Sequence, residues 1–432
     1  MGKYLISSLL STVVTVLIVS ISLFWLIDIS TDDIAVKLLG QFSTPEQRVS
    51  FNAQLGLDAP AWQRYADWLV GNDWRAESLV GHPLVAVDNP KSHEQEWWAR
   101  VDGQLMRWRL EDGRLFRLVR QGDGSTQAQP ADGDWRKDSQ GHEYFWGVTI
   151  FNSAILWYRA QSESRWALTE GGLRQEKGGA KKYLPLRKGL LRGDPGMSLQ
   201  YNRPVSRLLA PRIRNTAILA AAAFAVVMPL ALFLGILAGV REGSALDRII
   251  SVTGLVATAT PEYVTGIFLI MVFGIWLKIF PAVTLFTTSA AVLANPKMLV
   301  LPVLTLTAVE LGYVARLTRT SMVEVMASPY IRTAIVKGMP YWRVVIHHAI
   351  RNALMAPITI IMLHINWLIG GVVVVEVIFG YPGLGKYIYD AAIFGDYNAV
   401  EAATMVTVGI AVATRLIGDF GYTLLNPRIR YS

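Results

Sequence analysis

The chain contains almost no residues at the spacing that a catalytic or metal-binding motif requires. Gly380-Tyr-Pro-Gly-Leu-Gly385-Lys386 has the glycine and lysine spacing of a phosphate-binding loop, but Tyr387 stands where Ser or Thr would hold magnesium. No His-Glu-x-x-His pattern, carboxylate pair or nucleophile elbow occurs in the sequence, and it holds no cysteine. We therefore predict no catalytic residue and no metal site, and we interpret 380–386 as a turn rather than an ATP site.

A few polar side chains interrupt long apolar runs. Ionisable groups at such places usually line a cavity or pair with each other. Arg415 and Asp419 are four residues apart, which predicts an ion pair on one helix face. Glu310, His364 and Asn366 remain as candidates for lining a polar path through such a cavity.

The composition is that of a membrane protein. Hydrophobic residues make up 52% of the 432 positions and charged residues 17%, against about 25% in ordinary soluble domains. A helix needs about 20 apolar residues to cross a bilayer. Six runs meet this requirement, which predicts an all-α polytopic fold: Tyr4–Ile27, Thr216–Val240, Ile249–Phe280 (interrupted at Pro261-Glu262), Leu299–Thr318, Ala353–Phe379 and Ala399–Leu425. We interpret the first run as an uncleaved anchor rather than a signal peptide, because it is long and has no clear small-x-small cleavage site.

The charges between the runs predict their orientation. Short loops on one side collect eleven basic residues and those on the other only three, as the positive-inside rule requires of cytoplasmic loops. We expect both termini in the cytoplasm and residues 28–214 outside. The net charge of +8 thus reflects topology and does not indicate nucleic acid.

The expected outer segment, 28–214, holds a β-rich part at about 80–187, between the first and second spans. Asp102-Gly103 and Asp112-Gly113 separate alternating apolar and polar runs, which is a strong hairpin signal. Further strands are expected at 144–151 and 154–159. Ten of the fourteen tryptophans fall in the outer segment. We favour core packing for them over a contact surface for a partner or substrate.

The loop at about 319–352, within the expected five-helix part at 215–432, carries the most information. A short helix is expected from Tyr330 to Lys337, with Gly338 as its C-cap. Pro340 would start a second helix that continues into the fifth span. The small side chains of Thr333 and Ala334 would give a low face that another protein could approach.

This loop resembles the coupling loop of ABC importer permeases of the dipeptide, oligopeptide and nickel family. Tyr330 to Gly338 matches the Tyr-Val-Arg-Thr-Ala-x-x-Lys-Gly of that family apart from Ile331, and 348–354 matches its His-Ala-x-Arg-Asn-Ala-Leu. Similar matches occur at 55–60, 191–199, 376–385 and 419–431, where Asn426 replaces an Asp. The resemblance covers about 1–72 and 188–432, so that 73–187 looks like an insertion of undetermined role.

The resemblance implies a function and partners. It implies a transport subunit that is not itself an enzyme, docked through its loop on one or two ABC ATPase subunits that hold the ATP and magnesium. It also implies a location in the bacterial inner membrane, with a second homologous permease, a periplasmic binding protein and membrane lipid as partners. The implied ATPase-coupling residues are Tyr330, Arg332, Thr333, Ala334, Lys337, Gly338, Arg343 and Arg351. An ABC-coupled exporter and a membrane-anchored receptor with an outer ligand domain are the alternatives; a receptor would need a larger cytoplasmic module.

Overall fold

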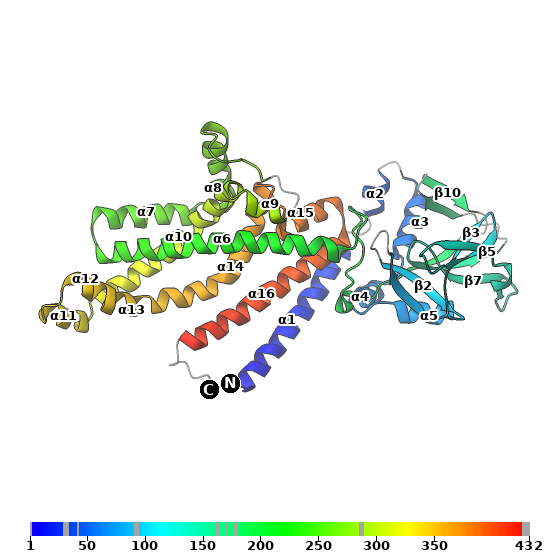
Figure 1. Cartoon of the computed structure of the whole chain (residues 1–432), viewed down its shortest axis with the longest axis horizontal. Coiled ribbons are helices and arrows are strands. Elements are labelled where there is room, and N and C mark those ends of the chain that lie inside the picture. Colours follow the sequence, from blue (N-terminus) through cyan, green and yellow to red (C-terminus); the bar gives the residue numbers. More distant parts are fainter. Residues whose placement is uncertain are drawn as a thin grey trace. The chain divides into compact units, whose positions relative to one another are not determined.

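A computed structural model describes residues 2–28, 34–40, 43–89, 95–159, 165–169, 172–176, 180–284 and 289–425. These residues form two compact units (Figure 1). We call residues 17–207 with 391–402 the outer unit, and residues 1–16, 208–390 and 403–432 the helical unit. Both units are therefore discontinuous in sequence, whereas the sequence suggested continuous parts with boundaries at 28 and 214.

The outer unit begins with helices from the N-terminal part of the chain: α1 (Gly2–Asp28, from residue 17), α2 (Ile34–Leu39), α3 (Pro45–Leu55), α4 (Ala61–Leu69) and α5 (Asp73–Val80). Thr44 caps α3 with a reciprocal side-chain and backbone pair to Gln47. Helix α4 packs on the end of α1, where the ring centroids of Phe24 and Tyr65 lie 5.3 Å apart.

Eleven strands follow among the described residues, which confirms a β-rich part inserted after the first helix. One antiparallel sheet has the order β1 (Leu84–Asp88), β2 (Gln95–Val101), β3 (Gln104–Glu111), β4 (Arg114–Arg120), β5 (Thr126–Pro130). A second has the order β11 (Ala180–Pro185), β8 (Ser153–Tyr158), β7 (Glu143–Val148), β6 (Arg136–Lys137), and β9 (Arg165–Thr169) pairs with β10 (Gly172–Glu176). The two sheets bury Trp97, Trp108 and Trp157 in a shared core. Core packing therefore holds for these tryptophans, whereas Trp62 and Trp74 on α4 and α5 are exposed.

Both Asp-Gly hairpins form where the sequence predicted them. Asp102 and Gly103 have φ of 47° and 81°, and Asp112 and Gly113 have φ of 47° and 78°. Two successive positive φ values match the right-handed twist of the flanking strands, which is why Asp-Gly is favoured there.

The outer unit is completed by η3 (Leu190–Arg192), by the start of α6 (Val205–Val240) and by the first residues of α16 (Tyr397–Leu425). Ser198 donates to the Asp396 carboxylate, and Asn398 Nδ2 donates to the Met197 carbonyl at 2.8 Å. These bonds attach the 191–199 segment to residues 396–398 at the start of α16, which are almost 200 residues further along the sequence.

The helical unit is built on α6, α10 (Lys297–Met326) and α14 (Met355–Ile378), with α7 (Ala245–Ala259) alongside α10 (Figure 1). Glycines allow these helices to approach closely, as is common in membrane bundles. A Cβ on Gly312 of α10 would meet the Gly254 carbonyl of α7, and Cβ atoms on Gly235 and Gly239 of α6 would meet Thr318 and Met322 of α10. The remaining helices of the described part are α8 (Glu262–Leu269), the π-helix η4 (Ile270–Trp276), α9 (Ser289–Ala294), α11 (Pro329–Val336), α12 (Tyr341–Arg343), the π-helical turn η5 (Val344–Ala349), α13 (Ile350–Ala353) and α15 (Leu384–Phe394).

Several of these helices are long and apolar enough to cross a membrane. Among the described residues, α1, α6, α10 and α16 meet the requirement individually, and α7 meets it together with α8 and η4. The chain is therefore a multi-pass membrane protein, mostly helical, with a β-rich insertion.

The expected third span is interrupted at Pro261, as the sequence predicted. α7 and the α8–η4 segment form an angle of 107°. Thr260 is extended (φ −85°, ψ 127°) because a following proline disfavours the helical conformation, and Pro261 supplies no N–H to continue the helix. The 15 residues of α7 extend only about 22 Å at 1.5 Å per residue, short of a bilayer core of about 30 Å.

Candidate functional site: the coupling segment

The short helix predicted in the 319–352 loop is present as α11. It starts at Pro329, where a missing N–H costs nothing, and ends at Val336. Gly338 has φ of 79°, and its N–H donates to the Ile335 carbonyl at 2.9 Å while Met339 N–H donates to Ala334 at 3.3 Å. This is the glycine-terminated helix end that the sequence predicted.

One face of α11 is buried in the helical unit. Ile331 and Ala334 pack with Met322 of α10, Val344 of η5 and Ala353 of α13. The expectation that Ala334 belongs to an accessible low face is therefore wrong: only 8% of its surface is exposed. Its position three residues after Ile331 puts it on the buried stripe of the helix, where a methyl group fits against Met322.

Polar contacts tie α11 to the helix that follows it. Asn352 Nδ2 donates to Tyr330 Oη at 2.9 Å and to the His348 carbonyl at 3.1 Å. Ser321 Oγ donates to the Ala353 carbonyl at 2.7 Å. The two matching sequence patterns, 330–338 and 348–354, are thus halves of one packed assembly. Gly338 and Pro340 therefore do not separate α11 from the segment that follows it, because α11 is braced against η5 and α13.

The other face of this assembly is exposed and carries the remaining predicted coupling residues. Val336 is 86% exposed, and the apolar side chains of Ile335, Tyr341 and Trp342 are also exposed. The exposed face further includes Tyr330, Arg332, Thr333, Lys337, Gly338, Arg343 and Arg351. An apolar patch with a basic rim on a rigid support is the usual form of a protein-binding surface.

Comparisons with known proteins agree with this geometry. Residues 231–431 match the family described as binding-protein-dependent transport system inner membrane component, and residues 1–82 match the N-terminal part of that family. The chain is 33% identical over 242 residues to a probable peptide ABC transporter permease of Sinorhizobium fredii, which covers 56% of this chain and 77% of the relative. This chain belongs to the binding-protein-dependent permease family. It is also 36% identical over 253 residues to the oligopeptide transport system permease AppB of Bacillus subtilis, covering 58% of this chain and 80% of that protein.

The permease has a further anchor beside the coupling segment that the sequence did not single out. Asp247 at the start of α7 accepts from Arg319 Nε and Nη2 (the latter at 2.8 Å) and from the Gly243 N–H at 2.9 Å. Asp247 is buried, and Arg319 is on α10 seven residues before α10 ends. A bidentate pair of this kind fixes the α6–α7 turn to the base of α10. The sequence signal that could have indicated Asp247 is a helix-capping serine, Ser244, followed three residues later by an acid.

The candidate path residues of the permease are only partly described. Glu310 is buried on α10, 3% exposed, and interacts electrostatically with Glu262 of α8. The Glu262 carboxylate lies against Gly371 of α14, so that α8 and α14 approach each other at this acidic pair. His364 and Asn366 are on α14 where the side chains are outside the described part, as is the Asp419 side chain expected to pair with Arg415.

The segment that resembles a phosphate loop has an internal function in the permease. Glu376, fully buried, accepts from the N–H groups of Gly385 and Lys386 at 2.7 and 3.1 Å and from Thr216 Oγ1 at 2.5 Å. The free N–H groups at the start of α15 are therefore satisfied by the chain's own carboxylate, in the position an anion would take. The interpretation of 380–386 as a turn fits this geometry.

Proposed function

We propose that this permease is a membrane-spanning subunit of an ATP-driven ABC importer for peptides or peptide-like solutes. Two relatives that are about one-third identical over most of their length are named as peptide or oligopeptide transport permeases. The observation that carries the proposal is α11: a braced helix with an exposed apolar face and a basic rim. An exporter subunit and a membrane-anchored receptor are less favoured, because the family match covers both the N-terminal part and the coupling segment.

The proposed topology has six crossings with both termini in the cytoplasm. α1, α6, α10, α14, α16 and the bent α7–α8–η4 pair would make the crossings. The uneven distribution of Lys and Arg between short loops supports the placement of α11 on the cytoplasmic side and of the β-rich insertion outside.

The proposed partners supply what this chain lacks. One or two ATPase subunits would hold ATP and magnesium, a second homologous permease would complete the path, and a periplasmic binding protein would deliver the solute. Surrounding lipid would contact the apolar helices. We expect no enzymatic activity in this chain by itself and no binding of nucleic acid.

Coupling follows from the packing of α11. ATP-driven closure of the ATPase would displace α11, and since its inner face packs on α10, η5 and α13, the displacement would pass directly into these helices. Two packed arrangements of such a core can differ by small shifts that are amplified along rigid helices. Glu310 would lie near the moving helices as a contact for the cationic end of a peptide.

Affinity purification from native membranes tests the ATPase contact. We expect an ABC ATPase and a second permease to copurify with the wild-type chain. Val336→Asp should reduce the ATPase yield at least fivefold, because the substitution places a charge in an apolar contact without altering the buried side. Leu191→Asp is the matched control: Leu191 is 72% exposed in the outer unit, and we expect a wild-type yield. Wild-type ATPase recovery with Val336→Asp would contradict the proposal.

The peptide cargo has its own test. Cells carrying the transporter should accumulate a labelled tripeptide in an ATP-dependent manner, and Glu310→Gln should reduce uptake if its charge meets the peptide. Uptake of unrelated sugars or of free metal ions, with none of the peptide, would overturn the assignment of cargo while leaving the ATPase contact intact.

A further inference from the structure

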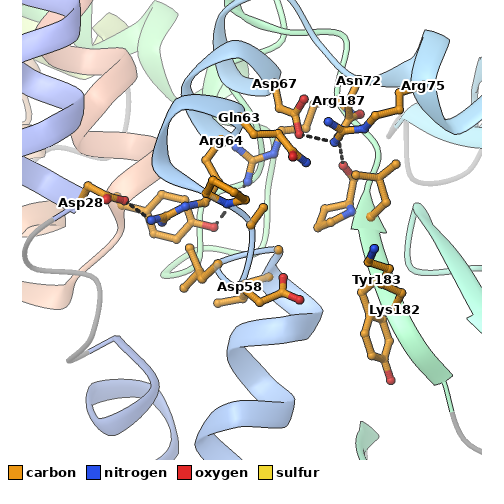
Figure 2. Close-up of a pocket in the computed structure, with 18 of the residues that line it drawn as sticks. Asp28, Asp58, Gln63, Arg64, Asp67, Asn72, Arg75, Lys182, Tyr183 and Arg187 are labelled. Atoms are coloured by element: carbon orange, nitrogen blue, oxygen red, sulfur yellow. Dashed lines mark hydrogen bonds and ion pairs between the residues drawn. The ribbon is translucent and has the colours of Figure 1, made fainter.

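The outer unit contains a cavity of about 450 Å³ (Figure 2). Its walls come from the end of α1, the 55–60 turn, α4, α5, β7, β11 and the start of α16. The segments that resemble permeases therefore form most of the wall, and the last strand of the insertion closes it. A volume of this size is in the range of small-molecule sites, about 300–1,000 Å³.

A clip of hydrogen bonds fixes the insertion against this wall. Asn72 donates through Nδ2 to the Pro185 carbonyl at 2.7 Å and accepts through Oδ1 from Arg187 N–H at 2.9 Å, while its own N–H donates to the Arg187 carbonyl at 3.1 Å. Gly56 lies against the Pro185 ring, where a Cβ would be 3.0 Å away. The position of β11 in the cavity wall is thus set by backbone and amide contacts rather than by loop length.

Part of the lining is apolar. Leu57 and Pro60 from the turn, Leu79 from α5, and Trp146 and Leu184 from the sheet contribute hydrocarbon surface. Such a lining suits a ligand with an apolar body and polar ends, as is general for small-molecule pockets.

The charged residues of the lining are balanced, and most have a partner. Four are acidic and four basic: Asp28, Asp58, Asp67 and Glu401, and Arg64, Arg75, Lys182 and Arg187. Arg64 pairs with Asp28 at 2.5 Å and Arg75 with Asp67 at 2.7 Å, as Figure 2 shows. Arg187 interacts electrostatically with Glu401 and donates to Tyr397 Oη at 3.4 Å.

Asp58 and Lys182 are left over from this pairing. Both side chains are exposed, and neither makes an ion pair within the part of the chain that the structure describes. The two residues lie on different parts of the outer unit: Asp58 is in the turn between α3 and α4, and Lys182 is on β11 of the insertion. In addition, the buried Arg64 Nε has no hydrogen-bond partner among the described residues. The cavity thus offers one free acid and one free base.

The geometry points to a binding site for a short zwitterionic peptide in this cavity, with the peptide's ammonium group at Asp58 and its carboxylate at Lys182. Charge balance disfavours a purely anionic or cationic ligand, and the volume excludes long chains. The choice of a peptide over another zwitterion rests on the proposed function. The site gives the insertion a role, because β11 supplies the basic half of the recognition.

Equilibrium binding to the purified full chain in lipid nanodiscs, without ATPase, tests this site. The probe is radiolabelled leucyl-alanine, and N-acetyl-leucyl-alanine amide is the competitor without charged ends. We expect saturable binding that the capped competitor does not displace. Asp58→Asn and Lys182→Gln should each weaken binding about tenfold, because each removes one charge-assisted contact.

The controls keep the result specific. Asp132→Asn and Lys137→Gln change exposed charges of the same outer unit away from the cavity lining and should bind as the wild type does. Absence of saturable binding, wild-type affinity in both cavity variants, or equal displacement by the capped competitor would overturn the site. Normal ATPase copurification with any of these results would show that the cavity assignment fails while the importer assignment stands.

Discussion

At the scale of single residues, buried carboxylates organise this permease. Glu376 is fully buried and yet accepts three hydrogen bonds, from Thr216, Gly385 and Lys386. A glycine is required at 383 because a Cβ there would overlap the carboxylate. The segment 376–385 is therefore a structural motif in which an acid caps the helix that follows it.

Glu376→Gln tests this role. The amide keeps the size of the side chain, but its NH2 must face either the Thr216 hydroxyl or the N–H groups of Gly385 and Lys386, so at least one buried donor loses its acceptor. We expect destabilisation of about 2 kcal/mol, seen as a lower Tm of the purified protein. Lys386→Ala is the control, since it removes only a surface pair with Asp390 worth about 0.5 kcal/mol and keeps the backbone donor. Equal Tm changes for the two variants would contradict the assignment.

Asp73 provides a pH test in the outer unit. Hydrogen bonds from Arg192, at 2.6 and 2.7 Å, hold the pKa of the Asp73 carboxyl below its usual 3.8. The folded state therefore favours the charged form, so its contribution to stability is present above pH 3.8 and is lost as the pH falls through the folded-state pKa. Asp73→Asn should be less stable than wild type at pH 7 by under about 1 kcal/mol, since the pair is partly exposed. The difference should shrink toward pH 3; a difference independent of pH would contradict the ion pair.

The sequence match indicates the residue types of the proposed coupling segment but not their contacts. Tyr330, Arg332 and Lys337 are exposed as a docking role requires, whereas Ala334 is buried. A nine-residue match fixes residue types but not which helix face packs inward, because that depends on Met322 and Val344 from other helices. The Tyr330–Asn352 hydrogen bond was also not predictable, since it depends on how the chain turns at Gly338.

At the scale of elements, glycine contacts set the spacing of the helices. α7 and α10 approach at Gly254 and Gly312, where a Cβ on Gly312 would lie 2.1 Å from the Gly254 carbonyl oxygen and 2.5 Å from Thr258 Oγ1. The Gly254 carbonyl belongs to the helix backbone and cannot give way by a rotamer change. The two helices can therefore pack this closely only with glycine at 312.

Gly312→Ala should accordingly reduce the yield of folded protein and lower its Tm, measured by fluorescence-detected size exclusion after heating. Gly409→Ala on α16 is the control, because a Cβ there meets nothing within 4 Å. Alanine also favours a helix over glycine by up to about 1 kcal/mol, so the control should be neutral or more stable. A Gly312→Ala protein as stable as wild type would refute the close contact.

Element predictions succeeded where one local signal dominated. The Asp-Gly turns, the Gly338 helix end and the long apolar helices all follow from backbone preference and hydropathy over a few residues. The bend of 107° between α7 and α8 did not follow, although Pro261 marked its position. A proline shows where a helix is interrupted, while the direction of the next helix is decided by packing, here of α8 against α10 and α14.

At the scale of the whole molecule, the chain combines a permease with an insertion that shares its outer unit. The cavity brings together 55–60, 182–187 and 397–401, three stretches separated by more than a hundred residues each. No local signal in the sequence predicts that these three stretches line one cavity, because their positions depend on contacts such as those of Asn72 with Pro185 and Arg187. The sequence predicted that an insertion exists, and the structure supplies the contacts that attach it to the permease segments.

The central claim is that the exposed face of α11 meets an ABC ATPase, and single-cysteine cross-linking in native membranes tests it most directly. The natural chain has no cysteine, so Val336→Cys and Leu191→Cys each introduce one unique thiol. Both positions are exposed, and both variants should express equally. With a short amine-to-thiol cross-linker, Val336→Cys should form a covalent product containing an ATPase subunit, and the product should change in yield when ATP is added. Leu191→Cys should give no ATPase product. An ATPase product from Leu191→Cys, or none from Val336→Cys in membranes where the ATPase is present, would contradict the account.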